Sequence, residues 1–122
     1  MTLYDSKILL VDDEAPLLKM VKDLLKNDGF WHVDTAADSA QAIARIEKNE
    51  YHLLILDVML PDGDGFHLFE DMKKIKGNDI CVIFLSARDE DRARLRGLGL
   101  GADDYVTKPF LPEELLLRIK SV

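Results

Sequence analysis

The chain alternates short apolar runs with segments of helical length, and this alternation constrains its fold more than any other feature. The apolar runs occupy residues 7–11, 32–36, 53–56, 80–85 and 105–107. Strand-length runs separated by helical patterns are typical of βα units that build a parallel sheet. The third and fourth runs are apolar almost throughout, as expected when helices cover both faces of the sheet. The alternation therefore predicts an α/β fold, a three-layer α/β/α sandwich.

Helix signals stand between the runs. Pro16 suits the first turn of a helix, and Gly29 lies just beyond the end of that helix. Asp38 or Ser39 is expected to cap the second helix. The five predicted helices cover residues 16–28, 39–48, 66–75, 92–98 and 112–119. A chain of 122 residues, 48% of them apolar, is long enough for one domain with a single core.

Charge and composition exclude several classes of protein. The net charge of -7 repels the phosphate backbone of nucleic acid, so these residues are not expected to bind DNA themselves. The single cysteine, Cys81, cannot form an internal disulfide, and its apolar neighbours predict a small buried core residue. No apolar run approaches the roughly 20 residues that span a bilayer. These features predict a cytoplasmic protein that does not associate with membranes.

Charged residues follow three of the predicted strands. Asp12 and Asp13 come directly after the first strand, Asp57 after the third, and Lys108 after the fifth. Because ligands gather at the carboxyl edge of a parallel sheet, we expect these side chains to converge there. Neighbouring carboxylates repel each other by roughly 4 kcal/mol per pair at an effective dielectric near 20, so the cluster needs a cation. Any single Asp could instead cap the following helix, but the set favours a Mg²⁺ site.

The same cluster suits phosphoryl transfer. A carboxylate can attack phosphorus when a metal and a cation neutralise the transferring group. Asp57 is the predicted nucleophile because it ends the central strand. Lys108 would pair with the phosphoryl oxygens as a point charge. Ser86, which follows the fourth run, would donate its hydroxyl to those oxygens, although a serine in such a place is equally ordinary as a helix cap.

These residues belong to longer motifs that resemble a known family. The motifs are Val-Asp-Asp-Glu at 11–14, Leu-Asp-Val-Met-Leu-Pro-Asp-Gly-Asp-Gly at 56–65, Leu-Ser-Ala-Arg at 85–88 and Gly-Ala-Asp-Asp-Tyr-Val-Thr-Lys-Pro-Phe at 101–110. Together, in this order, they closely resemble bacterial response-regulator receiver domains over nearly the whole chain. The resemblance implies the CheY-like, flavodoxin-like (βα)5 fold with sheet order 2-1-3-4-5.

The resemblance also implies roles at the phosphorylation site. Asp57 would accept a phosphoryl group from a phosphohistidine on a sensor histidine kinase. Asp13, Asp57 and the backbone carbonyl of Met59 would bind Mg²⁺, and Asp12 would join through water. The Met59 side chain would tune how fast water removes the phosphoryl group, so the lifetime of the active state stays open. The Lys108–Pro109 peptide bond, usually cis in the family, is expected to be cis here.

Two further residues resemble the family's switch pair. Ser86 would move toward the phosphoryl group, and the ring of Tyr105 would turn inward behind it. Phosphorylation would thereby shift an equilibrium between two states. Taken alone, Tyr105 is an ordinary strand aromatic.

The last third of the chain resembles the OmpR/PhoB type, in which the receiver precedes a winged-helix DNA-binding domain. Residues 1–122 would then be the N-terminal receiver of a longer transcription regulator. In that subfamily, charged residues on one face pair two phosphorylated receivers into a homodimer. The matching residues here are Arg94, Asp103, Asp104, Glu114 and Arg118. They could equally form a solvated surface, because exposed ion pairs contribute only about 0 to 1 kcal/mol each.

Other functions use similar residues. A Mg²⁺-dependent phosphatase of the aspartyl-phosphate class usually has a second Asp two residues after its nucleophile, where Met59 stands, so we expect a phosphoacceptor rather than an enzyme. A stand-alone signalling adaptor with a protein target remains the alternative. The glycine pattern at 97–102 follows a predicted helix, the reverse of a dinucleotide fingerprint. The acidic turn at 62–65 lacks the remaining ligands of a calcium loop and is expected to form a loop over the acid site.

Overall fold

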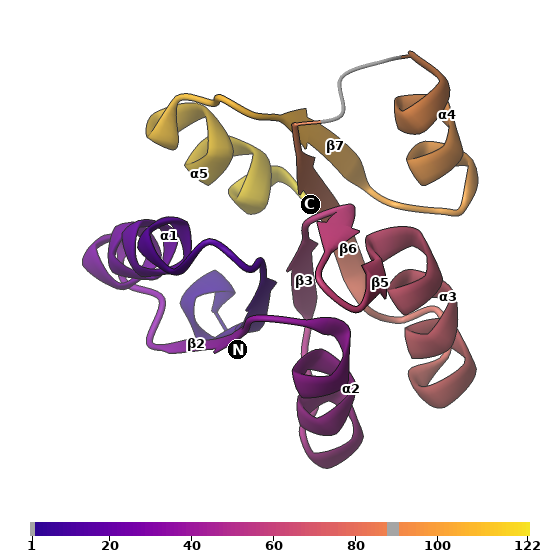
Figure 1. Ribbon diagram of the computed structural model, residues 1–122. Coiled ribbons are helices and arrows are strands. Elements are labelled where there is room, and N and C mark those ends of the chain that lie inside the picture. Colours follow the sequence, from indigo (N-terminus) through magenta and orange to yellow (C-terminus); the bar gives the residue numbers. More distant parts are fainter. Residues whose placement is uncertain (1, 88–90) are drawn as a thin grey trace.

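A five-stranded parallel sheet organises the protein (Figure 1). The computed structural model describes residues 2–87 and 91–122. The strands of this sheet are β1 (Lys7–Val11), β2 (His32–Ala36), β3 (Leu53–Leu56), β6 (Cys81–Ser86) and β7 (Asp104–Thr107). Their order is β2-β1-β3-β6-β7, which is 2-1-3-4-5 when these strands are counted along the chain. The predicted fold class and strand order are confirmed.

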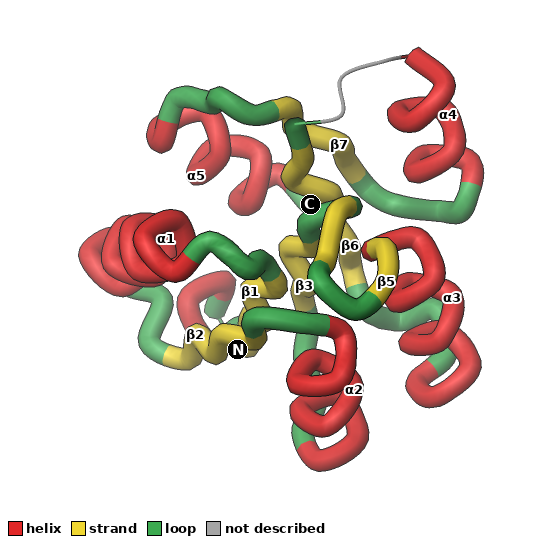
Figure 2. The backbone as a smooth tube through the Cα atoms, viewed as in Figure 1, coloured by secondary structure: helices red, strands yellow, loops and turns green. Residues whose placement is uncertain are grey.

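Helices cover both faces of the sheet (Figures 1 and 2). They are α1 (Ala15–Asp28), α2 (Ser39–Lys48), α3 (Gly65–Lys76), α4 (Asp91–Gly99) and α5 (Pro112–Ser121). Side chains of β1 alternate between the two faces, as a strand requires. Ile8 and Leu10 join the core beneath α1 and α5, whereas Leu9 and Val11 join the core shared by α2, α3 and α4. All four residues of β3 are buried because helices cover both faces of the sheet, which explains the continuous apolar run of this strand.

Local signals begin and end the helices as predicted. Pro16 lies in the first turn of α1, and Gly29 ends that helix with a φ of 120°, a conformation that glycine adopts without strain. The Asp38 side chain caps α2 by accepting a hydrogen bond from the backbone N–H of Gln41. None of the described helices is long and apolar enough to cross a membrane.

Three details differ from the sequence-based expectations. Residues expected to form only a loop include a small antiparallel hairpin, β4 (Met59–Leu60) and β5 (Gly63–Asp64). Cys81 packs against the core beneath α1 and α5 but is only half-buried, so the prediction of a buried core residue holds in part. It is the first residue of β6, and the five residues that follow it in the strand are buried. A short 3-10 turn, η1 (Leu3–Asp5), precedes β1. Arg88, the last residue of the third motif, lies outside the described residues.

Candidate functional site

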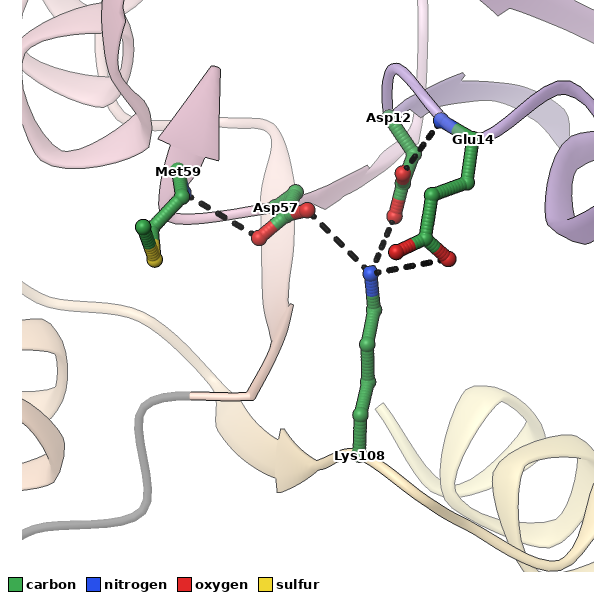
Figure 3. A network of polar contacts seen from close by, with 5 residues as sticks. All are labelled: Asp12, Glu14, Asp57, Met59 and Lys108. Carbon is green, nitrogen blue, oxygen red and sulfur yellow. Dashed lines mark hydrogen bonds and ion pairs between the residues drawn. The ribbon is translucent and has the colours of Figure 1, made fainter.

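The carboxyl edge of the sheet brings together the charged residues that the sequence placed at strand ends (Figure 3). Lys108, which follows β7, directs its Nζ toward two carboxylates. Nζ lies 2.7 Å from Asp12 Oδ2 and 3.2 Å from Asp57 Oδ2. A third carboxylate, that of Glu14, lies 3.8 Å away. Residues from three separate strand ends therefore form one ion-pair cluster.

Backbone groups orient both buried carboxylates. The N–H of Glu14 donates to Asp12 Oδ1 over 2.9 Å, and the N–H of Met59 donates to Asp57 Oδ1 over 3.1 Å. Each carboxylate thus has one oxygen on a backbone amide and the other on Lys108 (Figure 3). The two carboxylates are held in fixed orientations before any ligand arrives.

The segment after Asp57 is fixed by a close backbone contact at Gly65. The Gly65 N–H donates to the carbonyl of Val58 over 2.8 Å. A Cβ at this position would lie 2.2 Å from the Asp57 carbonyl oxygen, so only glycine fits. Packing therefore requires glycine at position 65, because it lets α3 begin directly against Asp57, the candidate phosphoacceptor.

Burial and charge act against each other in this cluster. Asp57 is only 6% exposed. Burial, opposed by the Met59 N–H and reinforced by the charge of Asp12, raises the pKa of Asp57 above its usual value. Burial also disfavours the charged form of Lys108, but the hydrogen bond that it donates to Asp12 and the charge of Asp57 raise its pKa overall. Lys108 therefore remains the cation that balances two buried carboxylates.

The acidic residues also meet the requirements of a hard metal ion. One carboxylate oxygen from each of Asp12, Asp13 and Asp57 lies within 4.8 Å of the others. Asp13 is exposed, so the cluster opens to solvent on its side. Carboxylate oxygens with access to water are the donor set that suits Mg²⁺. The residues present fit the ion that the sequence predicted.

The two residues of the predicted switch pair are both buried. Ser86 is completely buried at the end of β6, next to the strand that leads to Asp57. Tyr105 is 4% exposed, and its ring centre lies 6.1 Å from that of Phe84. A Cβ at Gly97 of α4 would lie 3.1 Å from the Tyr105 ring, so α4 packs directly over it. The aromatic ring is thus turned inward here.

The predicted dimer-face residues lie on α4, on α5, in β7 and, for Asp103, directly before β7. Arg118 pairs within the chain with Asp104 at 2.9 Å and with Glu114 at 3.2 Å. These pairs raise the pKa of Arg118, first through the hydrogen bond with Asp104. Asp103 Oδ2 accepts the backbone N–H of Val82 over 2.8 Å, a structural contact that the sequence did not indicate. Arg94 is exposed.

Sequence reasoning missed the contacts of two acidic residues, Glu14 beside Lys108 and Asp62 in the hairpin that follows Asp57. Glu14 approaches Lys108, and its signal was its place directly after Asp12 and Asp13. Asp62 accepts hydrogen bonds from the start of α2, a contact between residues 23 positions apart along the chain. Only the folded chain brings these groups together. The predicted cis peptide bond between Lys108 and Pro109 is confirmed.

Comparison with known proteins agrees with the geometry. Residues 8–120 match the family described as the response regulator receiver domain. The regulatory protein VanRc of Enterococcus gallinarum is 47% identical over 115 residues, which are 94% of this chain and 48% of VanRc. The phosphate regulon transcriptional regulatory protein PhoB of Escherichia coli is 44% identical over 117 residues, 95% of this chain and 51% of PhoB. The chain spans about half the length of these curated relatives.

Solved structures show the same fold. The beryllofluoride-activated receiver domain of DrrB has a TM-score of 0.86 and 37% identity, covering 96% of both chains. A longer structure of DrrB, described as an OmpR/PhoB homologue from Thermotoga maritima, has a TM-score of 0.84 and 38% identity, covering 95% of this chain and 51% of that one. With its matched family, its OmpR/PhoB-type relatives and its fold, this chain belongs to the response regulator receiver domains, the phosphoacceptor domains of two-component signalling.

Proposed function

We propose that Asp57 accepts a phosphoryl group from a phosphohistidine on a sensor histidine kinase. The observation that carries this proposal is the arrangement around Asp57. It is a buried carboxylate with one oxygen on a backbone amide and the other on the Lys108 ammonium, beside a second buried carboxylate, Asp12. Such a group is poised to hold a metal and to react with phosphorus.

In the proposed transfer, a carboxylate oxygen of Asp57 attacks phosphorus and forms an acyl phosphate. The P–N bond to the kinase histidine breaks, the electron pair stays on the imidazole nitrogen, and that nitrogen takes up a proton. The Nζ of Lys108 already lies 3.2 Å from Asp57 Oδ2 and would then pair with the negatively charged phosphoryl oxygens. The hydroxyl of Ser86, at the same edge of the sheet, would donate to one of them.

Mg²⁺ would be held by Asp13, Asp57 and the backbone carbonyl of Met59, with Asp12 joining through water. When bound, the ion would neutralise the charge that develops on the transferring phosphoryl group. The Met59 side chain, 60% exposed, would stand beside the phosphoryl group and affect the access of water to it. The carboxylate cluster supports this assignment because its oxygens already lie close enough to share one cation.

Intact-protein mass spectrometry after incubation with phosphoramidate and Mg²⁺ tests the proposal. The wild type should gain one phosphoryl group, and Asp57→Asn should gain none. Asp71→Asn, which removes an exposed carboxylate on α3, is the matched control and should behave as the wild type. Modification of Asp57→Asn, or a wild type that stays unmodified even with a histidine kinase, would contradict the proposal.

The proposed output is control of transcription by an attached winged-helix domain, in a cytoplasmic regulator that dimerises on phosphorylation. Relatives about twice as long as this chain, with names that describe transcriptional regulators, support it. A stand-alone adaptor that acts on a protein target is the second candidate, since the receiver chemistry would be the same. The test is the full-length gene product: a chain without a DNA-binding domain would favour the adaptor.

We also propose that the dimer forms through α4, β7 and α5. Beyond the charged residues, these elements expose Leu95, Leu98 and Leu117, apolar side chains that a partner would cover. Sedimentation velocity should show a dimer of the beryllofluoride-treated wild type and a monomer of treated Arg118→Ala. Lys19→Ala, which breaks an exposed ion pair on α1, is the control and should still dimerise. An activated wild type that stays monomeric at all concentrations would rule the dimer out.

A further inference from the structure

The hairpin that follows Asp57 is tied to a helix that lies far from it in the sequence. Asp62 stands at the tip of β4 and β5, between the paired residues Leu60 and Gly63. Its Oδ1 accepts the N–H of Ser39 over 2.8 Å, and its Oδ2 accepts the N–H of Ala40 over 3.1 Å. These are the first two residues of α2. One carboxylate therefore joins the phosphoacceptor segment to α2.

Asp62 is not needed as the conventional cap of α2, because another residue fills that place. Asp38 stands directly before the helix and accepts the N–H of Gln41 over 2.8 Å. The two carboxylates together satisfy the first three free N–H groups of the helix. The hydrogen bond from Ser39 is the largest cause that holds the pKa of Asp62 below its usual value. Asp62 is thus a second, long-range anion at the same helix end.

The hairpin itself is too short to hold its own orientation. Each strand has two residues, paired as Met59 with Asp64 and Leu60 with Gly63, and isolated two-stranded hairpins are marginally stable at best. Gly65 holds the base of the hairpin against Asp57, and the buried side chain of Leu60 fixes its depth in the core. At the tip, the side chain of Asp62 accepts the two hydrogen bonds from α2. Met59 lies between base and tip.

We propose that Asp62 is a positioning residue for the phosphorylation site. By tying the hairpin tip to α2, it holds the backbone of Met59, whose N–H contacts Asp57 Oδ1 at 3.1 Å. The inference rests on the proposed function, in which the carbonyl of Met59 is a ligand of Mg²⁺. Without the contact between Asp62 and α2, the hairpin tip would be more mobile. The N–H of Met59 would then contact Asp57 less often, and its carbonyl would less often be oriented to bind Mg²⁺.

The experiment compares Asp62→Ala with Asp38→Ala, which removes a cap from the same helix without touching the hairpin. In metal-free protein, the Met59 amide of Asp62→Ala should exchange with solvent faster than in the wild type. By calorimetric titration, its Mg²⁺ affinity should fall about tenfold, the lower end of the range for groups that orient metal ligands. Asp38→Ala should keep the wild-type values of both. Asp62→Ser, which restores one acceptor, should recover part of the affinity.

Equal losses of Mg²⁺ affinity in Asp62→Ala and Asp38→Ala would overturn the inference, because a general weakening of α2 would then explain both. Unchanged exchange of the Met59 amide in Asp62→Ala would overturn it as well. A wild type that neither binds Mg²⁺ nor accepts a phosphoryl group would overturn the proposed function instead. In that case amide exchange alone decides whether Asp62 positions the hairpin, since it is measured without metal.

Discussion

Helices α3 and α4 cover the same face of the sheet but are held to it very differently. Five residues of α3 are buried, among them Phe66 and Phe69, whose rings pack against Phe84. Among the described side chains of α4, Ala93 and Gly97 are buried, while Leu95 is 70% exposed. Helix α3 begins at Gly65, directly against Asp57, and α4 lies over Tyr105. The candidate phosphoacceptor is therefore next to the firmly packed helix, and the candidate switch residue is next to the loosely packed one.

This difference between α3 and α4 suits the proposed conformational switch. The proposed reaction with phosphorus would need fixed geometry next to Asp57, and the deep apolar contact of α3 favours it. An element that changes position needs a small difference in free energy between its states, and a helix with few buried side chains satisfies that condition. Substitutions in α3, in α4 and at the carboxyl edge of the sheet can test this difference.

The largest effect is expected from Phe66→Ala. Removing this fully buried ring leaves a cavity between α3 and β6 and should lower the free energy of unfolding by about 3–5 kcal/mol. Leu95→Ala is the matched control on α4 and should change it by less than about 0.5 kcal/mol. Urea denaturation measures both. Similar losses in the two variants would mean that α3 and α4 are equally important for stability.

Removing the cation at the carboxyl edge should have the next largest effect. Lys108→Met leaves the buried carboxylates of Asp12 and Asp57 without their counterion, at an expected loss of about 3 kcal/mol in metal-free buffer. The double variant Lys108→Met with Asp57→Asn should recover part of this loss, because it removes one of the two repelling charges. If the double variant is no more stable than the single one, repulsion between the carboxylates is not the cause.

Two glycines of α4 provide the smallest and most selective test. Alanine favours a helix over glycine by up to about 1 kcal/mol. At Gly99 a Cβ would meet nothing within 4 Å, so Gly99→Ala should be neutral or stabilising. At Gly97 a Cβ would lie 3.0 Å from the Phe84 ring and 3.1 Å from that of Tyr105, so Gly97→Ala should be the less stable variant and should alter the near-ultraviolet circular dichroism of Tyr105. The reverse order of stability would show that α4 does not depend on close contact with Tyr105.

Much of the candidate site could be predicted because the end of each strand can be recognised in the local sequence, and the fold then brings the strand ends together. Asp12, Asp57 and Lys108 each follow an apolar run, and parallel strands carry their ends to one edge. The hairpin of β4 and β5 could not be predicted, because two-residue strands have no periodicity. The roles proposed for Ser86, Tyr105 and the dimer-face residues remain predictions from resemblance, supported by where these residues lie.

The sequence by itself determined the alternation of strands and helices, the helix ends and which charged groups follow the strands at the candidate site. Hydrophobic periodicity, capping and side-chain chemistry are all local properties of the chain. Only the tertiary structure decided how Lys108 contacts both Asp12 and Asp57, that Asp62 reaches α2, and that Gly97 lets α4 pack over Tyr105. These contacts join residues distant in sequence, and their distances depend on how the helices pack on the sheet, which no local pattern specifies.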